Sequence, residues 1–359
     1  MSVLGGGVSR EASLALPGRG STNRPAMTIH LPELFRRFRW LKGARLESPA
    51  PVEEPSDELM AILRCPISGA PLAWNPIVRR LRTADGNMDY DVIGGIPIIV
   101  PPVECNDDEP GDPAEFALRY DRIIGSARMQ EFYGESGYFN VGYWTPQTPD
   151  LGSACERLVD EVSAAIPASA KLILDVGCGV GAATLRIIKT RPGATVIGVN
   201  VSLWQLQQAR RRGVAISLVS NATKLAIRSD SIDAVTAIES AQHFVTRADF
   251  FSESFRVLRG GGRIALADML FSHPEKVGSW MLCDANRLES VEEYKALLEA
   301  AGFVNVLVTD VTNHCWMPYC AALRSVYKDE EGIVDTLERS LSHYVIASAT
   351  KPQTSASSR

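Results

Sequence analysis

The sequence predicts an α/β protein in which a small N-terminal α+β module precedes a doubly wound, mostly parallel sheet. The first observation is an apolar run, residues 172–176, that leads directly into a glycine-rich turn. The second is a regular alternation of strand-like and helix-like segments from residue 171 to residue 309. With 359 residues, of which 45% are hydrophobic, the chain is long enough to bury a full core and carry an appended module.

Composition divides the chain into five parts. Residues 1–56 are rich in Gly, Ser, Pro and Arg and are expected to form a disordered basic tail. A small ribbon-like module follows at 57–104, then a linker with an aromatic lid at 105–150. The main domain is expected at 151–350 and a second disordered tail at 351–359. In the basic tail, apolar residues 31, 34, 35, 38 and 41 fall on one helical face, which suggests either a docking helix or a solvated extension.

The elements of the main domain follow one another at the pitch of a parallel sheet. Helices are predicted at 152–165, 180–190, 202–212, 247–258 and 291–301, and strands at 171–176, 195–200, 215–220, 232–238, 263–268 and 303–309. A last strand is predicted at 341–349, with one inserted helix within 317–340. Ser290 and Glu293 form a capping box, and Gly260–Gly262 is expected to close a helix.

The turn after the first strand of this domain indicates a bound ligand. Glycines at 177, 179 and 181 permit positive φ and close approach to the backbone, while the following helix points unpaired N–H groups at the turn. A dinucleotide fingerprint would require a glycine where Ala182 stands, and a phosphate loop would require G-K-[S/T]. Asp175, two residues before the first glycine, instead favours a cationic ligand.

The pattern Asp175-x-Gly177-x-Gly179-x-Gly181 resembles the first motif of class I S-adenosylmethionine-dependent methyltransferases. The resemblance implies a Rossmann-like methyltransferase sheet with S-adenosylmethionine as cofactor. In such a sheet the loops after successive strands meet at one edge. The cofactor residues that it implies are Asp175, Gly177, Cys178, Gly179, Gly181, Asn200, Ser202, Asn221, Ala222 and Glu239. Asn200 and Asn221 stand where the family usually has acids, so adapted cofactor contacts are expected.

The run Glu239-Ser-x-x-His243 resembles the sugar and polyketide O-methyltransferases of natural-product biosynthesis, and so does Asn140-x-Gly142-Tyr143-Trp144. The spacing of His243 and Asp268 matches the pair implicated as catalytic in the rebeccamycin-type enzymes. The resemblance implies an enzyme that moves a methyl group to a hydroxyl, with His243 as general base and Asp268 supporting the imidazole.

Aromatic residues in three segments are expected to border one apolar pocket for a bulky secondary metabolite. The candidate acceptor contacts are Tyr138, Tyr143, Trp144, Trp280, Trp316 and Tyr319. Two alternatives stay open. One is methyl transfer to carbon on a terpenoid or quinone-like acceptor, and the other is a non-catalytic protein that binds S-adenosylmethionine or activates a partner.

The N-terminal module, with its Cys65-Pro66 knuckle and closing Gly-Ile96-Pro strand, resembles the zinc-ribbon-like family that activates tRNA methyltransferases. Ser68 stands where a ribbon needs its second cysteine, so no metal site is predicted. The module is expected to cover an edge of the main domain or to help it form a homodimer, with partner recruitment as the alternative.

The formal net charge of −5 argues against nucleic acid as a partner, since phosphate neutralisation needs a basic surface. The sequence lacks an apolar run long enough to span a bilayer, so no integral membrane association is expected. Seven cysteines without a C-x-x-C pair indicate reduced thiols and a cytoplasmic protein. The predicted partner is a small-molecule acceptor.

Overall fold

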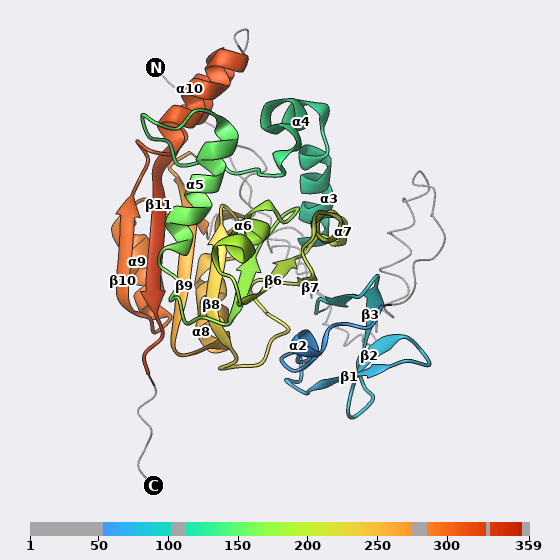
Figure 1. Ribbon diagram of the computed structural model, residues 1–359. Helices are drawn as coiled ribbons and strands as arrows, with labels where there is room; N and C mark the ends of the chain where they lie inside the picture. The colour runs from blue at the N-terminus through green and yellow to red at the C-terminus, as the bar shows by residue number, and fades with distance from the viewer. Residues whose placement is uncertain (1–52, 102–112, 274–285, 328–330, 354–359) are drawn as a thin grey trace, which may run out of the picture. The chain divides into compact units, whose positions relative to one another are not determined.

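The computed structural model describes residues 53–101, 113–273, 286–327 and 331–353. Their centre is a sheet of eleven strands in the order β1-β2-β3-β4-β7-β6-β5-β8-β9-β11-β10 (Figure 1). The central strands are β5 (Leu172–Val176), β6 (Thr195–Asn200), β7 (Ile216–Ser220), β8 (Ile232–Ile238) and β9 (Leu258–Phe271). These five run parallel to one another. The predicted doubly wound α/β sheet is therefore present.

Side chains that alternate along the central strands separate two apolar cores, as expected for strands covered on both faces. Ile173 packs with the helices α5 (Leu151–Ser163) and α6 (Ala182–Thr190) on one face of the sheet. Its neighbour Leu174 packs with α8 (Arg247–Val257) and α9 (Val291–Ala300) on the other face. Helix α7 (Leu203–Arg212) contacts β6 and β7. Because the helices lie on both faces, the loops at the carboxyl ends of the parallel strands stay free to form a site.

The C-terminal strands close the sheet with antiparallel pairs. Strand β11 (Leu341–Thr350) lies between β9 and the edge strand β10 (Val304–Asp310). The glycines 260–262 lie within β9. Two hydrogen bonds join them to the residue after β11: Gly261 N–H donates to the Lys351 carbonyl, and Lys351 N–H donates to the Gly262 carbonyl. The prediction that these glycines close a helix is wrong.

The insertion between β10 and β11 contains two helices, α10 (Trp316–Val326) and α11 (Glu331–Glu338), where the sequence predicted one. Arg324 of α10 pairs with Asp335 at 2.7 Å and with Glu338 at 2.6 Å, both on α11. These ion pairs hold the second helix against the first, which a single continuous helix would not allow.

The N-terminal module joins the same sheet. After the short helix α2 (Asp57–Met60), strands β1 (Leu72–Asn75), β2 (Arg80–Thr83), β3 (Asp89–Ile93) and β4 (Ile96–Ile99) form an antiparallel meander. Strand β4 then pairs in parallel with β7, with Ile98 opposite Val219. The module thereby occupies the edge of the sheet that β7 would otherwise expose.

The knuckle of the module is held by hydrogen bonds. The Cys65 thiol lies 3.0 Å from the Tyr90 hydroxyl and accepts the Ser68 N–H at 3.4 Å. Within the described ranges, no group of three or more His, Cys, Asp and Glu side chains is arranged to hold a metal ion. Nor does any described helix combine the length and apolarity needed to cross a bilayer.

Candidate functional site

A cavity opens at the carboxyl ends of β5, β6, β7 and β8, above the glycine-rich turn. Most of the residues that the sequence predicts as cofactor contacts line it: Asp175, Gly177, Cys178, Gly179, Asn200, Asn221, Ala222 and Glu239. They come from the ends of four strands that are distant in sequence. The topology predicted for a doubly wound sheet brings them together at one edge.

The three glycines of the turn, all with positive φ, have different tasks. A Cβ on Gly177 would lie 2.3 Å from Ser240 Cβ, and one on Gly181 would lie 2.7 Å from Ala209 Cβ, so both positions are needed for packing. Gly181 packs against Ala209 and Val214 without lining the cavity. A Cβ on Gly179 would meet only Gln205 Oε1, at 3.9 Å. The middle glycine therefore leaves open the space that a bound cofactor would need.

Asp175 lies fully buried at the base of this turn. Its carboxylate accepts hydrogen bonds from Thr184 Oγ1 at 2.6 Å and from Thr236 Oγ1 at 3.1 Å. Burial raises its pKa to about 6, against the two hydroxyl bonds that favour the charged form. A cationic ligand above the turn would favour the ionised carboxylate further.

Two of the predicted cofactor residues make contacts of another kind. Ser202 is buried and its hydroxyl caps α7, accepting Gln205 N–H at 3.1 Å, while it donates to the carboxylate of Asp121. It does not line the cavity. Asn221 lines the cavity but uses Oδ1 within its own turn, where it accepts from Thr223. Ser202 therefore has no direct contact with the cavity and is linked to it by its hydrogen bond with Gln205, which lines the cavity.

Glu239 has an unusual backbone for a non-glycine residue, with φ at +52°. Its Oε1 accepts the Val141 N–H at 2.8 Å and the Tyr344 hydroxyl at 2.6 Å. Burial raises its pKa to about 7. The sequence predicts a cofactor contact here. The structure also ties Glu239 to the aromatic segment before α5 and to strand β11.

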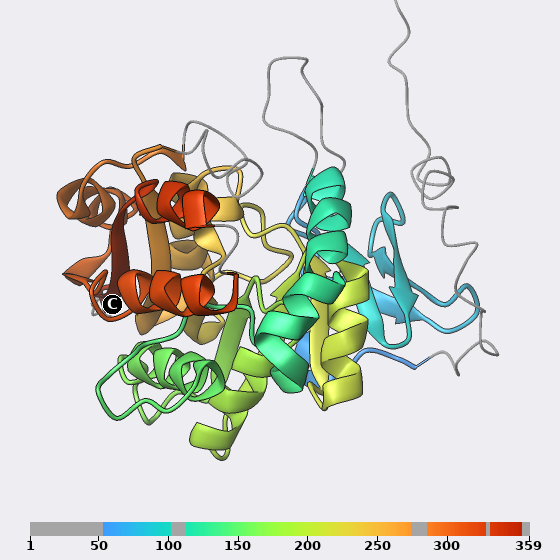
Figure 2. The ribbon, with the colours of Figure 1, turned by 90° about the horizontal axis from the view of Figure 1, so that it is seen from above.

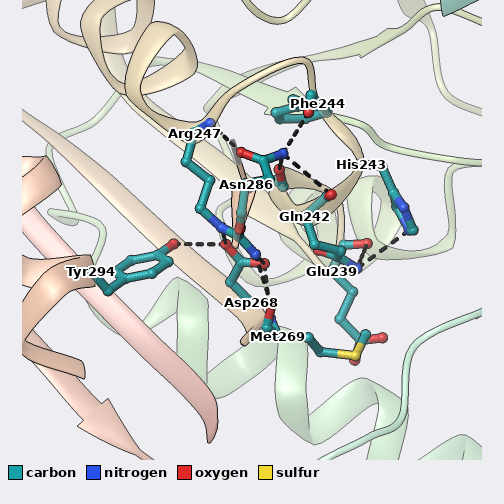
Figure 3. Close-up of polar contacts among 10 residues, drawn as sticks. Glu239, Gln242, His243, Phe244, Arg247, Asp268, Met269, Asn286 and Tyr294 are labelled. Carbon is teal, nitrogen blue, oxygen red and sulfur yellow. Dashed lines mark hydrogen bonds and ion pairs between the residues drawn. The ribbon is translucent and has the colours of Figure 1, made fainter. Parts of the chain in front are cut away.

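His243 lies in a short 3-10 helix, η3 (Ala241–His243), and its ring forms part of the cavity wall. The imidazole packs against two aromatic rings of helix α3 (Pro113–Ile124), with centroid distances of 5.2 Å to Phe116 and 5.0 Å to Tyr120. Its Nε2 lies 3.3 Å from Nε2 of Gln242 (Figure 3). An imidazole in this position can meet an acceptor that enters the cavity beside the glycine turn.

Asp268 has other partners than the one predicted. It is fully buried within β9, three residues before the strand ends, and forms an ion pair with Arg247, whose Nε lies 2.8 Å from Oδ2. It also accepts from Tyr294 Oη at 3.0 Å and from the Met269 N–H at 2.8 Å. Figure 3 shows the His243 ring directed away from this carboxylate. The Asp268 carboxylate thus pairs with the Arg247 guanidinium, which offsets part of the cost of burying its charge, where the sequence predicts the His243 imidazole as its partner.

Asn286 links that ion pair to the segment that carries His243. It accepts the Arg247 N–H through Oδ1 at 2.6 Å, and its Nδ2 donates to the carbonyl oxygens of Ala241, Gln242 and Phe244 (Figure 3). Arg247 in turn donates to the Asn286 carbonyl. This series of hydrogen bonds, from Asp268 through Arg247 to Asn286, therefore fixes the backbone of η3.

The predicted acceptor contacts divide between the cavity and the surrounding core. Tyr138 lines the cavity. Tyr143 instead stacks on His314, at 4.9 Å and 6°, and Trp144 donates Nε1–H to the Val141 carbonyl. Neither residue lines the cavity. The prediction that they contact the acceptor is not matched by their positions.

The remaining acceptor contacts lie deeper or outside the described residues. Trp316 is buried against Phe271 and donates to the Glu338 carbonyl, and Tyr319 accepts from the Tyr133 hydroxyl at 3.1 Å. Both belong to the core next to the cavity and do not line it. Trp280 lies outside the described residues.

Helix α3 supplies cavity residues that sequence reasoning missed. Phe116, Ala117, Tyr120 and Ile124 line the cavity, and Asp121 binds Ser202 and Gln205 next to it. In Figures 1 and 2 this helix lies beside α7. The signal was present in the sequence, since residues 116, 120 and 124 repeat at the spacing of one helical face.

Comparison with known proteins identifies the family of the chain. Residues 174–266 match the family described as "Methyltransferase domain". The chain is 37% identical over 190 residues to Methyltransferase GfsG of Streptomyces halstedii, covering 48% of this chain and 68% of that protein. It is 31% identical over 207 residues to Erythromycin 3''-O-methyltransferase of Saccharopolyspora erythraea, covering 52% and 68%. It is 32% identical over 214 residues to O-methyltransferase resE of Aspergillus sclerotiorum, covering 55% and 80%.

Solved structures share the fold. The [4+2]-cyclase SpnF superposes with a TM-score of 0.56 at 22% identity, covering 68% of this chain and 98% of that one. Geranyl diphosphate C-methyltransferase from Streptomyces coelicolor, solved with S-adenosylhomocysteine, gives 0.53 at 19% identity, covering 67% and 100%. Since the glycine turn, the cavity and the relatives agree, the chain belongs to the S-adenosylmethionine-dependent methyltransferases and is an enzyme with that cofactor.

Proposed function

We propose that this enzyme methylates a hydroxyl oxygen of a bulky, partly apolar small molecule of secondary metabolism, with His243 as the general base. The observation that carries the proposal is the position of the His243 imidazole in the cavity wall beside the glycine turn. The aromatic side chains of Phe116, Tyr120 and Tyr138 line the same cavity and suit an apolar acceptor. Several relatives carry O-methyltransferase names, which supports oxygen as the methylated atom.

In the proposed reaction the bound cofactor supplies a methyl group on a positively charged sulfur. The glycine turn with Asp175 at its base would hold that cofactor, which would give its methyl group to the acceptor oxygen and leave as the neutral thioether. His243 takes the hydroxyl proton, for which an imidazole is suited at neutral pH. The aromatic rings of α3 exclude water, and the Asp268–Arg247–Asn286 chain positions η3.

A direct test incubates the enzyme with methyl-labelled S-adenosylmethionine and a panel of hydroxylated secondary metabolites. The expected product is a labelled methyl ether, identified by mass spectrometry and by the chemical shift of the methyl group. A labelled methyl group on carbon would support the C-methyltransferase alternative and overturn the proposal. An assay without acceptor controls for hydrolysis of the cofactor.

We also propose that residues 57–104, which resemble a zinc-ribbon-like module, serve as a structural cover of the sheet edge. The parallel pairing of β4 with β7 supports this role. Hydrogen bonds from the segment after α2 to the β7–β8 connection support it too: Arg64 N–H donates to the Ala226 carbonyl at 3.0 Å, and Arg228 N–H donates to that of Ile62 at 2.8 Å.

The pKa of Asp175 leads to a pH prediction for cofactor binding. Since burial raises this pKa to about 6, lowering the pH through 6 protonates the carboxylate and removes its attraction for a cationic ligand. S-adenosylmethionine affinity, measured by calorimetry from pH 8 to pH 5, is therefore expected to fall as the pH drops. The Asp175→Asn variant should bind more weakly at pH 8 and show a flatter profile. Equal slopes in the two proteins would assign the pH dependence to another group.

A further inference from the structure

We propose that Asp121, on helix α3, positions two amides that line the cofactor cavity and thereby replaces the carboxylate that is missing at position 200. In doubly wound sheets that bind nucleosides, an acid after the second strand receives the ribose hydroxyls. Strand β6 is the second parallel strand of this domain in chain order, and it ends in Asn200. The nearest carboxylate to that amide in the hydrogen-bond network comes from α3.

A ring of hydrogen bonds joins α3 to the turn between β6 and α7. Asp121 Oδ1 accepts from Gln205 Nε2 at 2.7 Å, and Gln205 Oε1 accepts from Asn200 Nδ2 at 3.0 Å. Asn200 Oδ1 accepts the Ser202 N–H at 3.2 Å. Ser202 Oγ closes the ring by donating to Asp121, at 2.8 Å from Oδ1 and 2.9 Å from Oδ2.

The carboxylate decides the orientation of both amides, because it can only accept hydrogen bonds. Gln205 must turn its NH₂ group toward Asp121, which leaves its oxygen for Asn200. Asn200 must then direct its NH₂ group toward Gln205 and its oxygen toward Ser202. Gln205 and Asn200 both line the cavity, so the carboxylate sets the donors and acceptors that they offer to a ligand.

The energetics and placement of Asp121 suit such a task. The side chain is half-buried, and desolvation raises its pKa while the bonds from Gln205 and Ser202 oppose that rise. It lies at the first turn of the ten-residue helix α7, where the helix dipole favours a negative charge. Helix α3, which carries Asp121, also places Phe116 and Tyr120 against the His243 ring. Through α3, cofactor recognition and the acceptor side of the cavity share one element.

The decisive test moves the carboxylate from α3 to β6. In Asp121→Asn the side chain keeps one oxygen but exchanges the other for an NH₂ group, so the negative charge is lost and Gln205 can turn either end of its amide toward position 121. We expect S-adenosylhomocysteine, measured by calorimetry, to bind roughly 10-fold or more weakly, as for loss of a hydrogen bond to a charged group. The double variant D121N/N200D gives Gln205 and Ser202 an acceptor at position 200 again and should regain most of that affinity.

Controls separate this role from simple support of the fold. The Glu115→Gln variant removes an exposed carboxylate from the first turn of α3 and should bind like the wild type. Asn200→Asp alone sets a carboxylate against Gln205 Oε1 and should also weaken binding. Unfolding midpoints show which variants are folded. If D121N alone does not fold, the affinity of the double variant D121N/N200D for S-adenosylhomocysteine is compared with that of Asn200→Asp.

Restored binding in D121N/N200D supports the proposal, because a carboxylate that only anchored α3 would not be replaced by one on β6. The proposal is overturned if D121N binds like the wild type, or if the folded double variant binds no better than the weaker single variant.

Discussion

Replacing His243 by alanine is expected to lower turnover by ~10²–10⁴, the usual contribution of a positioned general base. Cofactor affinity should stay close to that of the wild type, because the imidazole packs on the rings of α3 and not on the glycine turn. Turnover is measured with the acceptor found in the panel, and affinity by calorimetry with S-adenosylhomocysteine.

His314 offers a matched control for that substitution. It is exposed and stacks on Tyr143 outside the cavity, so His314→Ala should keep turnover within a few-fold of the wild type. An active His243→Ala enzyme would show that another group, or the solvent, takes the proton. Glu239 would then be the first residue to test, because its pKa of about 7 also allows proton transfer at neutral pH.

Replacing Arg247 by methionine is expected to cost ~3–5 kcal/mol of unfolding free energy, because it leaves Asp268 charged and buried without its cation. The measurement is urea denaturation followed by circular dichroism. Turnover should fall as well, since Arg247 holds Asn286 and through it the backbone of η3.

Two further variants show whether the lost stability comes from the burial of the ion pair. Arg157→Met breaks an exposed pair with Glu161 and should cost only ~0–1 kcal/mol. The double variant R247M/D268L removes both buried charges and should be more stable than R247M alone. If R247M is no less stable than R157M, the pair contributes nothing beyond a surface ion pair, contrary to its burial.

Local pattern was sufficient to predict most of the fold. The strands at 172–176 and 195–200 are recognisable because buried parallel strands are short, apolar and bounded by turn residues. The glycine turn and the positive charge of its ligand were predicted together, because the glycine spacing and the acid Asp175 lie within a few residues of each other. The division of the insertion into two helices was not predicted, because the ion pairs of Arg324 join residues that are 11 and 14 positions apart in the sequence.

The candidate site was predictable only as far as the topology fixes it. The residues at strand ends converge as expected, but their partners depend on contacts between distant segments. The spacing of His243 and Asp268 could not reveal that Arg247 takes the carboxylate. Likewise, the helical stripe of α3 gave no indication of which surface it covers. The role of an acid on such a helix, like Asp121, can be assigned only once its partners Ser202 and Gln205, at the start of α7, are known.

The parallel pair of β4 and β7 has a consequence for how the protein is made. Strand β4 leaves the ribosome before β5 and β6, yet its partner β7 follows both of them in the chain. During synthesis, the antiparallel meander of β1, β2 and β3 can form from neighbouring residues, whereas docking of β4 must wait until the later strands have emerged. Strand β4 is therefore translated before β5 and β6 but can reach its final place only after β7.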